Sequence, residues 1–410
     1  MPETVVIIGG GLAAARAAET LREHEFGGTV VIVAAEDELP YERPPLSKGV
    51  LLGKDGAETA YVHEADWYDE HAVELRRGVA ATAIDREARS VTLSDGSSLS
   101  YDALLVATGA RPRPLEVPGA DLAGVHLLRT MADSAALLAR LREQPRVVVV
   151  GAGWIGLEVA AAARTHGCEV DVVEPARAPL LGVLGPELGD VFRRLHEDHG
   201  VRFHLGEGVA EILGSTGVTG VRTSAGQDLA ADLVVVGVGV VPNVELAEAA
   251  GLEVDDGILV DAAMRSSDPV VFAAGDVARW ENPTLGYRVR VEHWATAYTT
   301  GPIAARAILG EAVDNDVLPF FFSDQYDLGL EYVGHVRRDA AAEVVVRGDL
   351  DGREFVAFWV DEDGRVLAGL AVNVWDTVEP VKALIRSGVQ VPRDRLADAG
   401  IPLTELAPTT

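Results

Sequence analysis

The sequence predicts an α/β fold with two Rossmann-like domains, one inserted in the other, followed by a C-terminal α+β domain. Two observations lead to this prediction. A pattern of strand, glycine turn, helix and strand occurs twice. From Leu318 onward the pattern changes to strand-like runs that alternate with turns. The strands of the repeated pattern are continuous Val and Ile runs, which are typical of strands buried on both faces of a parallel sheet.

The first copy of the pattern begins at the N-terminus. Residues 4–8 form an apolar strand that leads into a glycine turn at residues 9–14, and an alanine-rich helix then extends to Glu23. A second strand is predicted at Thr29–Ala35, and Glu36 follows it. The pattern is that of a βαβ unit with an acid at the end of its second strand.

The second copy repeats these features in the same order. A valine strand at 147–150 leads into the turn at 151–156, and a helix is expected through Thr165. The next strand, Glu169–Val173, is followed by Glu174. A single copy could be a glycine turn without a ligand, but two copies with matching acids favour two dinucleotide-binding domains.

The glycine turn has a physical role in holding a pyrophosphate. Gly9 and Gly11 permit a tight turn and close approach of the backbone, and the small Ala14 lets the helix pack on the strand. The unpaired N–H groups at the helix start attract the diphosphate. Glu36 and Glu174 can accept hydrogen bonds from ribose hydroxyls, and a carboxylate there favours NADH over NADPH. Arg177 could weaken this preference, but we interpret it as a solvent-facing charge.

The predicted domain boundaries follow from two connecting segments and from one change in the sequence pattern. Segments rich in glycine and proline lie at 111–119 and 237–243. After residue 318, strands are predicted at Val344–Arg347, Phe355–Val360 and Val366–Val372, with a helix near Glu379–Arg386. The predicted domains are therefore 1–111 with 244–317, the insert 112–243, and 318–410.

Composition limits the classes of function. The chain has 410 residues and a formal net charge of −29, which argues against nucleic acid and anionic membranes as partners. Apolar runs stay below the ~18 residues of a membrane helix. With one cysteine, Cys168, and no basic leader, we expect a cytoplasmic protein without disulfides. The sequence carries no motif of hydrolysis or phosphoryl transfer, and no metal site is expected.

Six further short sequence motifs occur along the chain in addition to the two glycine turns. They are Arg43–Lys48, Ala107–Gly109, Gly237–Asn243, Ala274–Asp276, Glu292–Trp294 and Ser323–Asp327. This set resembles the two-dinucleotide-binding flavoprotein reductases over nearly the whole chain, and most of all the ferredoxin reductases of bacterial oxygenase systems. One departure is visible, because relatives often have Trp before the last string and this chain has Phe320–Phe322.

The resemblance implies FAD in the N-terminal domain and NADH in the inserted one. The residues implied at FAD are Gly9, Gly11, Leu12, Ala13, Ala14, Glu36, Arg43, Lys48, Ala81, Ala107, Thr108, Gly109, Asp276, Glu292, His293 and Trp294. Those implied at NAD are Gly151, Gly153, Trp154, Ile155, Gly156, Glu158, Glu174, Gly237 and Gly239.

Some of these residues have alternative interpretations. Asp276 could cap a helix, Arg43 and Lys48 could be solvated charges, and Trp294 could be a core residue. For the active site we predict an ion pair between Lys48 and Glu158 beside the flavin and nicotinamide.

The implied activity is that of an NADH:ferredoxin oxidoreductase serving an oxygenase. Residues 40–53 contain no cysteine, and Cys168 is interpreted as a turn or core residue, so electrons are expected to leave the flavin directly. A ferredoxin dock is predicted at Arg288, Arg290 and Arg306, although ordinary salt-bridged surface is the alternative. Two other functions stay open, namely a rubredoxin or monodehydroascorbate reductase and a non-catalytic NAD-sensing flavoprotein resembling apoptosis-inducing factor.

Overall fold

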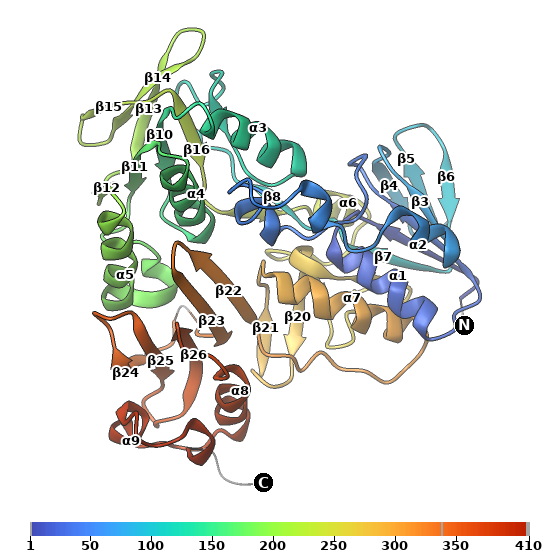
Figure 1. Ribbon diagram of the computed structural model, residues 1–410. Helices are drawn as coiled ribbons and strands as arrows, with labels where there is room; N and C mark the ends of the chain where they lie inside the picture. Colours follow the sequence, from blue (N-terminus) through green and yellow to red (C-terminus); the bar gives the residue numbers. More distant parts are fainter. Residues whose placement is uncertain (1, 338, 407–410) are drawn as a thin grey trace. The chain divides into compact units, whose positions relative to one another are not determined.

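The computed structural model describes residues 2–337 and 339–406, and the chain forms two compact units (Figure 1). Unit 1 comprises 1–42, 60–111 and 241–321, and unit 2 comprises 43–59, 112–240 and 322–410. Residue 1 and residues 407–410, at the ends of the predicted first and third domains, lie outside the described residues. The segment 43–59, expected in the first domain, clusters with unit 2, and so does the C-terminal region.

Unit 1 is built on a parallel sheet of five strands. Their order is β19-β7-β1-β2-β3. The strands are β1 (Thr4–Ile8), β2 (Thr29–Val33), β3 (Val73–Arg76), β7 (Ala103–Val106) and β19 (Val271–Ala273). The central strand β1 is buried on both faces, as its continuous apolar run predicted.

Helices and smaller sheets complete unit 1. The helices are α1 (Leu12–Glu23), α2 (Ala65–Glu70), α6 (Glu245–Ala249) and α7 (Trp294–Ile308). Helices α1 and α7 pack side by side (Figure 1), and they come so close at Gly301 that a Cβ there would lie 2.3 Å from the Ala13 carbonyl oxygen. The smaller sheets hold β4 (Ala81–Asp85), β5 (Ser90–Leu93) and β6 (Ser98–Ser100), and β18 (Ile258–Val260), β20 (Ala278–Asn282) and β21 (Tyr287–Val289).

Unit 2 has a similar parallel sheet, but its edge strand β9 precedes the central strand in the chain, whereas β19 of unit 1 comes last. Its parallel sheet has the order β12-β11-β10-β16-β9, with the strand that precedes the glycine turn again at the centre. The strands are β9 (Val125–His126), β10 (Arg146–Val150), β11 (Glu169–Glu174), β12 (Val201–Leu205) and β16 (Leu233–Val236). The helices are α3 (Met131–Leu141), α4 (Trp154–Thr165) and α5 (Leu181–Asp198), and a small sheet holds β13 (Val209–Gly214), β14 (Val218–Thr223) and β15 (Asp228–Ala230).

Two short strands lie where the chain passes from one unit to the other. They are β8 (Ala110–Pro112) and β17 (Val240–Pro242). Both coincide with the glycine- and proline-rich connectors that marked the domain boundaries in the sequence.

The C-terminal region of unit 2 forms a separate five-stranded sheet. Its order is β22-β23-β26-β25-β24, and β23, β26, β25 and β24 pair antiparallel. The strands are β22 (Phe320–Gln325), β23 (Leu328–Gly334), β24 (Glu343–Asp349), β25 (Glu354–Val360) and β26 (Val366–Val372). Helices α8 (Val378–Ser387) and α9 (Arg393–Ala397) complete it.

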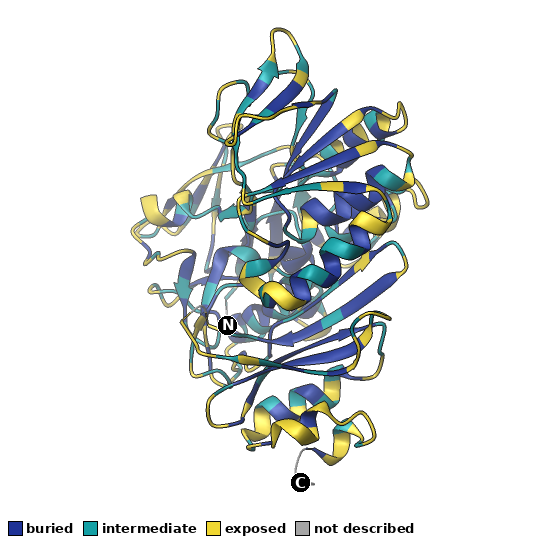
Figure 2. Ribbon diagram, turned by 90° about the vertical axis from the view of Figure 1, so that its left-hand side faces the viewer, coloured by how far each residue is buried: buried dark blue, intermediate teal, exposed yellow. Residues whose placement is uncertain are grey.

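The predicted fold class is confirmed: two Rossmann-like domains and a C-terminal α+β domain are present. Figure 2 shows the strands mostly buried, with exposed residues on loops and on the outer faces of helices. In the part of the chain that the structure describes, no helix has the length and apolar character needed to cross a membrane.

Candidate functional site

The first glycine turn packs against the end of the neighbouring strand β7, and the start of α1 stays open. Gly9 has φ +133°, and a Cβ there would lie 2.1 Å from the Ala107 carbonyl oxygen, so only glycine fits. Gly11 is the N-cap of α1, and a Cβ at Gly11 would meet no atom of the described residues within 4 Å. The helix start therefore faces open space that fits a diphosphate.

The second glycine turn has the same construction in unit 2. Gly151 has φ +101° and leaves 2.5 Å between a built Cβ and the Gly237 carbonyl oxygen. At Gly156 a Cβ would lie 2.1 Å from the oxygen of Gly151, so the helix packs directly on the turn. Gly153 caps α4, and a Cβ at that position would touch no described residue within 4 Å. The residues thus fit a second pyrophosphate.

The two predicted ribose acids lie at the ends of their strands. Glu36 follows β2 and accepts a hydrogen bond from the Tyr41 hydroxyl at 2.6 Å. Glu174 is the last residue of β11, and its carboxylate accepts from the backbone N–H groups of Ala152 (2.7 Å) and Ala176 (2.8 Å). Glu174 is therefore fixed beside the second glycine turn.

Other residues expected at FAD gather in unit 1. Thr108 and Asn243 exchange two hydrogen bonds of 2.8 Å, which tie the strand-end loop after β7 to the segment before α6. Asp276 lies inside a short 3₁₀ turn whose N-cap is Ala274, so the helix-cap alternative for Asp276 does not apply.

The start of α7 contributes an aromatic pair. Trp294 is the first residue of this helix and stacks on Tyr298 with ring centroids 4.8 Å apart. His293 caps the helix and lies against Phe321, at 4.7 Å between ring centroids. Burial raises the pKa of Glu42, and a hydrogen bond with Trp294 partly offsets this effect.

The other predicted site residues lie at the starts of helices and strands or in unit 2. Leu12, Ala13 and Ala14 are buried in the first turn of α1, and Ala81 begins β4. In unit 2, Trp154 and Ile155 begin α4, and Ile155 is 46% exposed. Arg43 also belongs to unit 2, where its guanidinium donates to the Arg129 carbonyl oxygen.

The predicted ion pair between Lys48 and Glu158 is present. The distance from Lys48 Nζ to Glu158 Oε1 is 2.7 Å, and Glu158 is only 4% exposed. Glu158 lies on α4, and Lys48 follows a 3₁₀ turn at Pro44–Ser47. Lys48 Nζ also lies 5.5 Å from the centre of the ring of Phe322, one of the three phenylalanines before Ser323. Mutual compensation explains how both charges are tolerated with little exposure.

Two serines complete this cluster, and sequence reasoning did not identify them. Ser47 Oγ donates to Glu158 Oε2 at 2.5 Å, and Ser323 Oγ donates to Glu158 Oε1 at 2.6 Å. Both serines lie within motif strings, and Ser47 directly precedes Lys48, which had been given a role. Only the fold shows that their hydroxyls meet on one carboxylate.

The predicted docking arginines each have an acidic partner. Arg288 pairs with Glu281 at 2.8 Å, and Arg306 with Glu311 at 2.7 Å. The side chain of Arg290 is only 10% exposed. Arg290 also pairs with Asp256 at 3.0 Å and with Glu292. Arg290 therefore offers little exposed positive charge for a dock, because its side chain is mostly buried and two carboxylates pair with its terminal nitrogens.

Cys168 is a core residue. It is fully buried behind the helix-to-strand turn of unit 2, and burial raises the pKa of its thiol, which disfavours the reactive thiolate. Within the ranges that the structure describes, no cluster of metal-ligating side chains is found.

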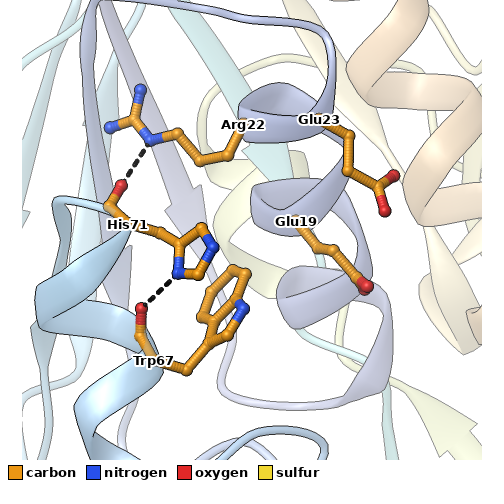
Figure 3. Close-up of a pocket in the computed structure, with 5 residues that line it drawn as sticks. All are labelled: Glu19, Arg22, Glu23, Trp67 and His71. Atoms are coloured by element: carbon orange, nitrogen blue, oxygen red, sulfur yellow. Dashed lines mark hydrogen bonds between the residues drawn. The ribbon is translucent and has the colours of Figure 1, made fainter.

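A separate pocket of about 190 Å³ lies on the surface of unit 1 (Figure 3). Glu19, Arg22 and Glu23 of α1 line one side, and Trp67 of α2 and His71, the residue after α2, line the other. The Arg22 guanidinium is already occupied by backbone carbonyl groups, including that of His71 at 2.8 Å, and His71 stacks on Trp67. These contacts fasten α2 to α1, and we assign the pocket no part in the site.

Comparison with known proteins gives the class of the chain. The family model of the pyridine nucleotide-disulphide oxidoreductases matches residues 3–301, and a reductase C-terminal model matches residues 320–407. The chain belongs to this family of oxidoreductases. Membership of this family implies FAD and NADH as cofactors, as the sequence predicted. The two glycine cradles, which are the open helix starts at Gly11 and Gly153, fit these dinucleotides.

Individual relatives are similar over their full lengths. The ferredoxin–NAD(+) reductase component of an anthranilate 1,2-dioxygenase system from Burkholderia cepacia is 43% identical, covering 97% of this chain and 98% of that protein. Putidaredoxin reductase of Pseudomonas putida is 37% identical, over 98% and 96%. Among solved structures, a covalent putidaredoxin reductase–putidaredoxin complex superimposes with a TM-score of 0.94 at 37% identity, covering 98% of each chain.

Proposed function

We propose that this protein is an NADH:ferredoxin oxidoreductase that supplies electrons to an oxygenase. The observation that carries the proposal is the pair of glycine cradles, together with the buried ion pair of Lys48 and Glu158. Relatives similar over their full lengths are named as ferredoxin reductases of oxygenase systems, which supports a ferredoxin as acceptor. The cytoplasmic location expected from the sequence stays a prediction.

Each cradle would hold one dinucleotide by its diphosphate. The open helix start at Gly11, with Glu36, would hold FAD, and the open helix start at Gly153, with Glu174, would hold NADH. When bound, these groups supply hydride transfer and the release of single electrons. The protein itself supplies orientation and fixed charge.

Lys48 and Glu158 would act where the hydride moves. The ammonium favours negative charge that develops next to it, and it needs no reorganisation because Glu158 already holds it. The carboxylate is fixed by its donors and can orient the nicotinamide ring. The fully buried Cys168 offers no exposed thiol for disulfide chemistry, so electrons would leave through the flavin directly.

The proposal is tested with purified protein, NADH and a ferredoxin. FAD should copurify with the protein, and NADH should drive steady reduction of the ferredoxin. A folded protein that takes up no FAD would contradict the proposal. Uptake of FAD and NADH without electron delivery to ferredoxin, rubredoxin or monodehydroascorbate would instead indicate a sensor.

A further inference from the structure

The Glu158 carboxylate accepts several hydrogen bonds from side chains of unit 2. Three side chains donate to its two oxygens: Ser47 to Oε2, and Lys48 and Ser323 to Oε1, at 2.5, 2.7 and 2.6 Å. Glu158, Ser47 and Ser323 are 4%, 4% and 1% exposed, so water does not replace these donors. The carboxylate therefore has one orientation, and donors from two separate segments, 43–59 and β22, impose it.

The direction of the Ser323 hydrogen bond is determined by its neighbours. Gln325 Nε2 donates to Ser323 Oγ at 3.2 Å. The hydroxyl oxygen of Ser323 thus receives a hydrogen from one side and has its single proton left for Glu158. Without this neighbour, the hydroxyl could rotate toward other acceptors.

The orientation of Gln325 is determined in turn by a buried histidine. Gln325 Oε1 lies 2.9 Å from His196 Nε2, so this nitrogen must carry the hydrogen. A neutral ring then leaves Nδ1 as an acceptor for the Tyr326 hydroxyl, 3.3 Å away. The amide of Gln325 is therefore held with its NH₂ group toward Ser323. A directed chain of hydrogen bonds runs from α5 through β22 to the carboxylate on α4.

We propose that Ser323 is a positioning residue of the reductase site: its hydroxyl, directed by Gln325, holds the Glu158 carboxylate, so that the C-terminal region completes the site. The inference rests on the proposed function, in which Glu158 orients the nicotinamide. It assigns to β22 a role in binding NAD, apart from its place in the C-terminal sheet.

The test is a double-mutant cycle on the equilibrium dissociation constant of NAD⁺ with the FAD-loaded protein. Ser323→Ala should raise this constant about fivefold, somewhat less than loss of a full hydrogen bond to a charged group, because Lys48 and Ser47 still hold the carboxylate. In a Glu158→Ala background, the same change should have almost no further effect. Ser323→Thr keeps the hydroxyl and should restore the parent value to within about twofold.

Ser134 offers a matched control. It is equally buried in unit 2, and its hydroxyl donates at 2.8 Å to a backbone carbonyl group, that of Leu46, and not to Glu158. Ser134→Ala should change the dissociation constant by the same small factor in both backgrounds. If Glu158→Ala does not fold, Glu158→Gln serves as the background, and the Ser323→Ala effect should shrink there.

Two outcomes would overturn the inference. One is a Ser323→Ala protein with the parent dissociation constant, and the other is an equal change in both backgrounds, which would show a merely structural role. A parent protein that binds NAD⁺ but does not reduce ferredoxin would overturn the proposed function, while the cycle would still report on Ser323.

Discussion

At the proposed nucleotide sites, single residues would determine which cofactor fits. Glu174 is held by two backbone N–H groups at the end of β11, so its carboxylate cannot easily move away from an incoming ligand. A 2′-phosphate would meet this fixed negative charge, whereas a free 2′-hydroxyl would donate to it. Arg177 is exposed, in line with the interpretation of a solvent-facing charge.

NADH should therefore reduce the protein faster than NADPH does. Replacement of Glu174 by Gln should narrow the preference by roughly tenfold, because the repulsion is removed and the backbone contacts can partly persist. Flavin reduction rates with each nucleotide measure this change. Arg177→Gln is the companion variant and should leave the preference unchanged. Equal use of both nucleotides by the parent protein would mean that Glu174 does not face the ribose.

Lys48 gives the second prediction at this scale. If Lys48 acts as proposed, Lys48→Ala should slow flavin reduction by NADH roughly a hundredfold, because a preorganised charge is lost. The measurement is a stopped-flow trace of flavin absorbance. Lys54 belongs to the same segment and is exposed, so Lys54→Ala is the control. A Lys48→Ala protein that reacts at the parent rate would show that the ion pair is only structural.

His196, which belongs to the buried hydrogen-bond chain, should make the stability of the fold depend on pH. Burial lowers the pKa of this fully buried histidine from 6.5 to about 4. Between pH 6.5 and 4 the unfolded chain binds a proton at this position that the folded chain does not. The stability of the folded state should therefore fall as pH drops through this window, by up to about 3 kcal/mol from this group.

The thermal midpoint measured from pH 7 to 4 tests this expectation. His196→Gln should lower the midpoint at pH 7 and flatten its dependence on pH, since the titrating group is gone. His71→Gln, at an exposed position, is the reference variant. The same pH dependence in the parent and in His196→Gln would argue against a role for this histidine.

At the scale of secondary structure, the two glycine turns are the elements that define the molecule. Each joins the central strand of a parallel sheet to a helix, and each combines a glycine that the fold requires with one at which a Cβ would meet no described atom, where we propose that a ligand binds. Gly9 and Gly151 are required by the fold, because a Cβ would collide with a carbonyl group of a neighbouring strand end. Gly11 and Gly153 have open space in front of them.

This difference predicts two kinds of alanine variant. Gly11→Ala should fold normally, because its backbone has a negative φ and its Cβ meets no described atom, yet FAD affinity should fall by about tenfold or more as the methyl group fills the cradle. Gly9→Ala should instead reduce the yield of folded protein. FAD titration of the apoprotein separates the two effects.

Gly27→Ala serves as the control, since Gly27 also has open surroundings and lies outside the cradle. Gly153→Ala should mirror the Gly11 result for NAD⁺ and leave FAD binding intact. Full FAD affinity in Gly11→Ala would mean that the diphosphate lies elsewhere.

The charge of the whole molecule governs association with a partner. At −29, the chain as a whole repels an acidic carrier, so a local positive surface is needed. Arg306 remains a candidate for that surface, because its side chain is 43% exposed and its pair with Glu311 is a surface salt bridge, which a partner can exchange at little cost.

Arg306→Glu should slow ferredoxin reduction several-fold at low salt and leave ferricyanide reduction almost unchanged. Arg265 has a similarly exposed side chain (38%), and Arg265→Glu is the matched control. Equal slowing with both acceptors would show that Arg306 acts on the fold or the flavin and has no part in docking.

The fold class, the two glycine turns and the acids at the strand ends could all be predicted from the sequence. These features depend on local rules, namely the burial of continuous apolar strands, the backbone freedom of glycine and the open N–H groups at a helix start. The helices after both turns end where the sequence predicted, at Glu23 and Thr165, but they begin earlier, at Leu12 and Trp154, within the predicted turns.

Contacts between side chains that are distant in the chain could be seen only in the folded structure. Ser47 and Ser323 lie 111 and 165 positions from Glu158, and their hydroxyls reach one carboxylate because three segments pack together in unit 2. Likewise, Arg290 looked exposed beside its motif, but packing buried it between two acids. No local pattern encodes such contacts, since they depend on the summed packing of segments far apart in the chain.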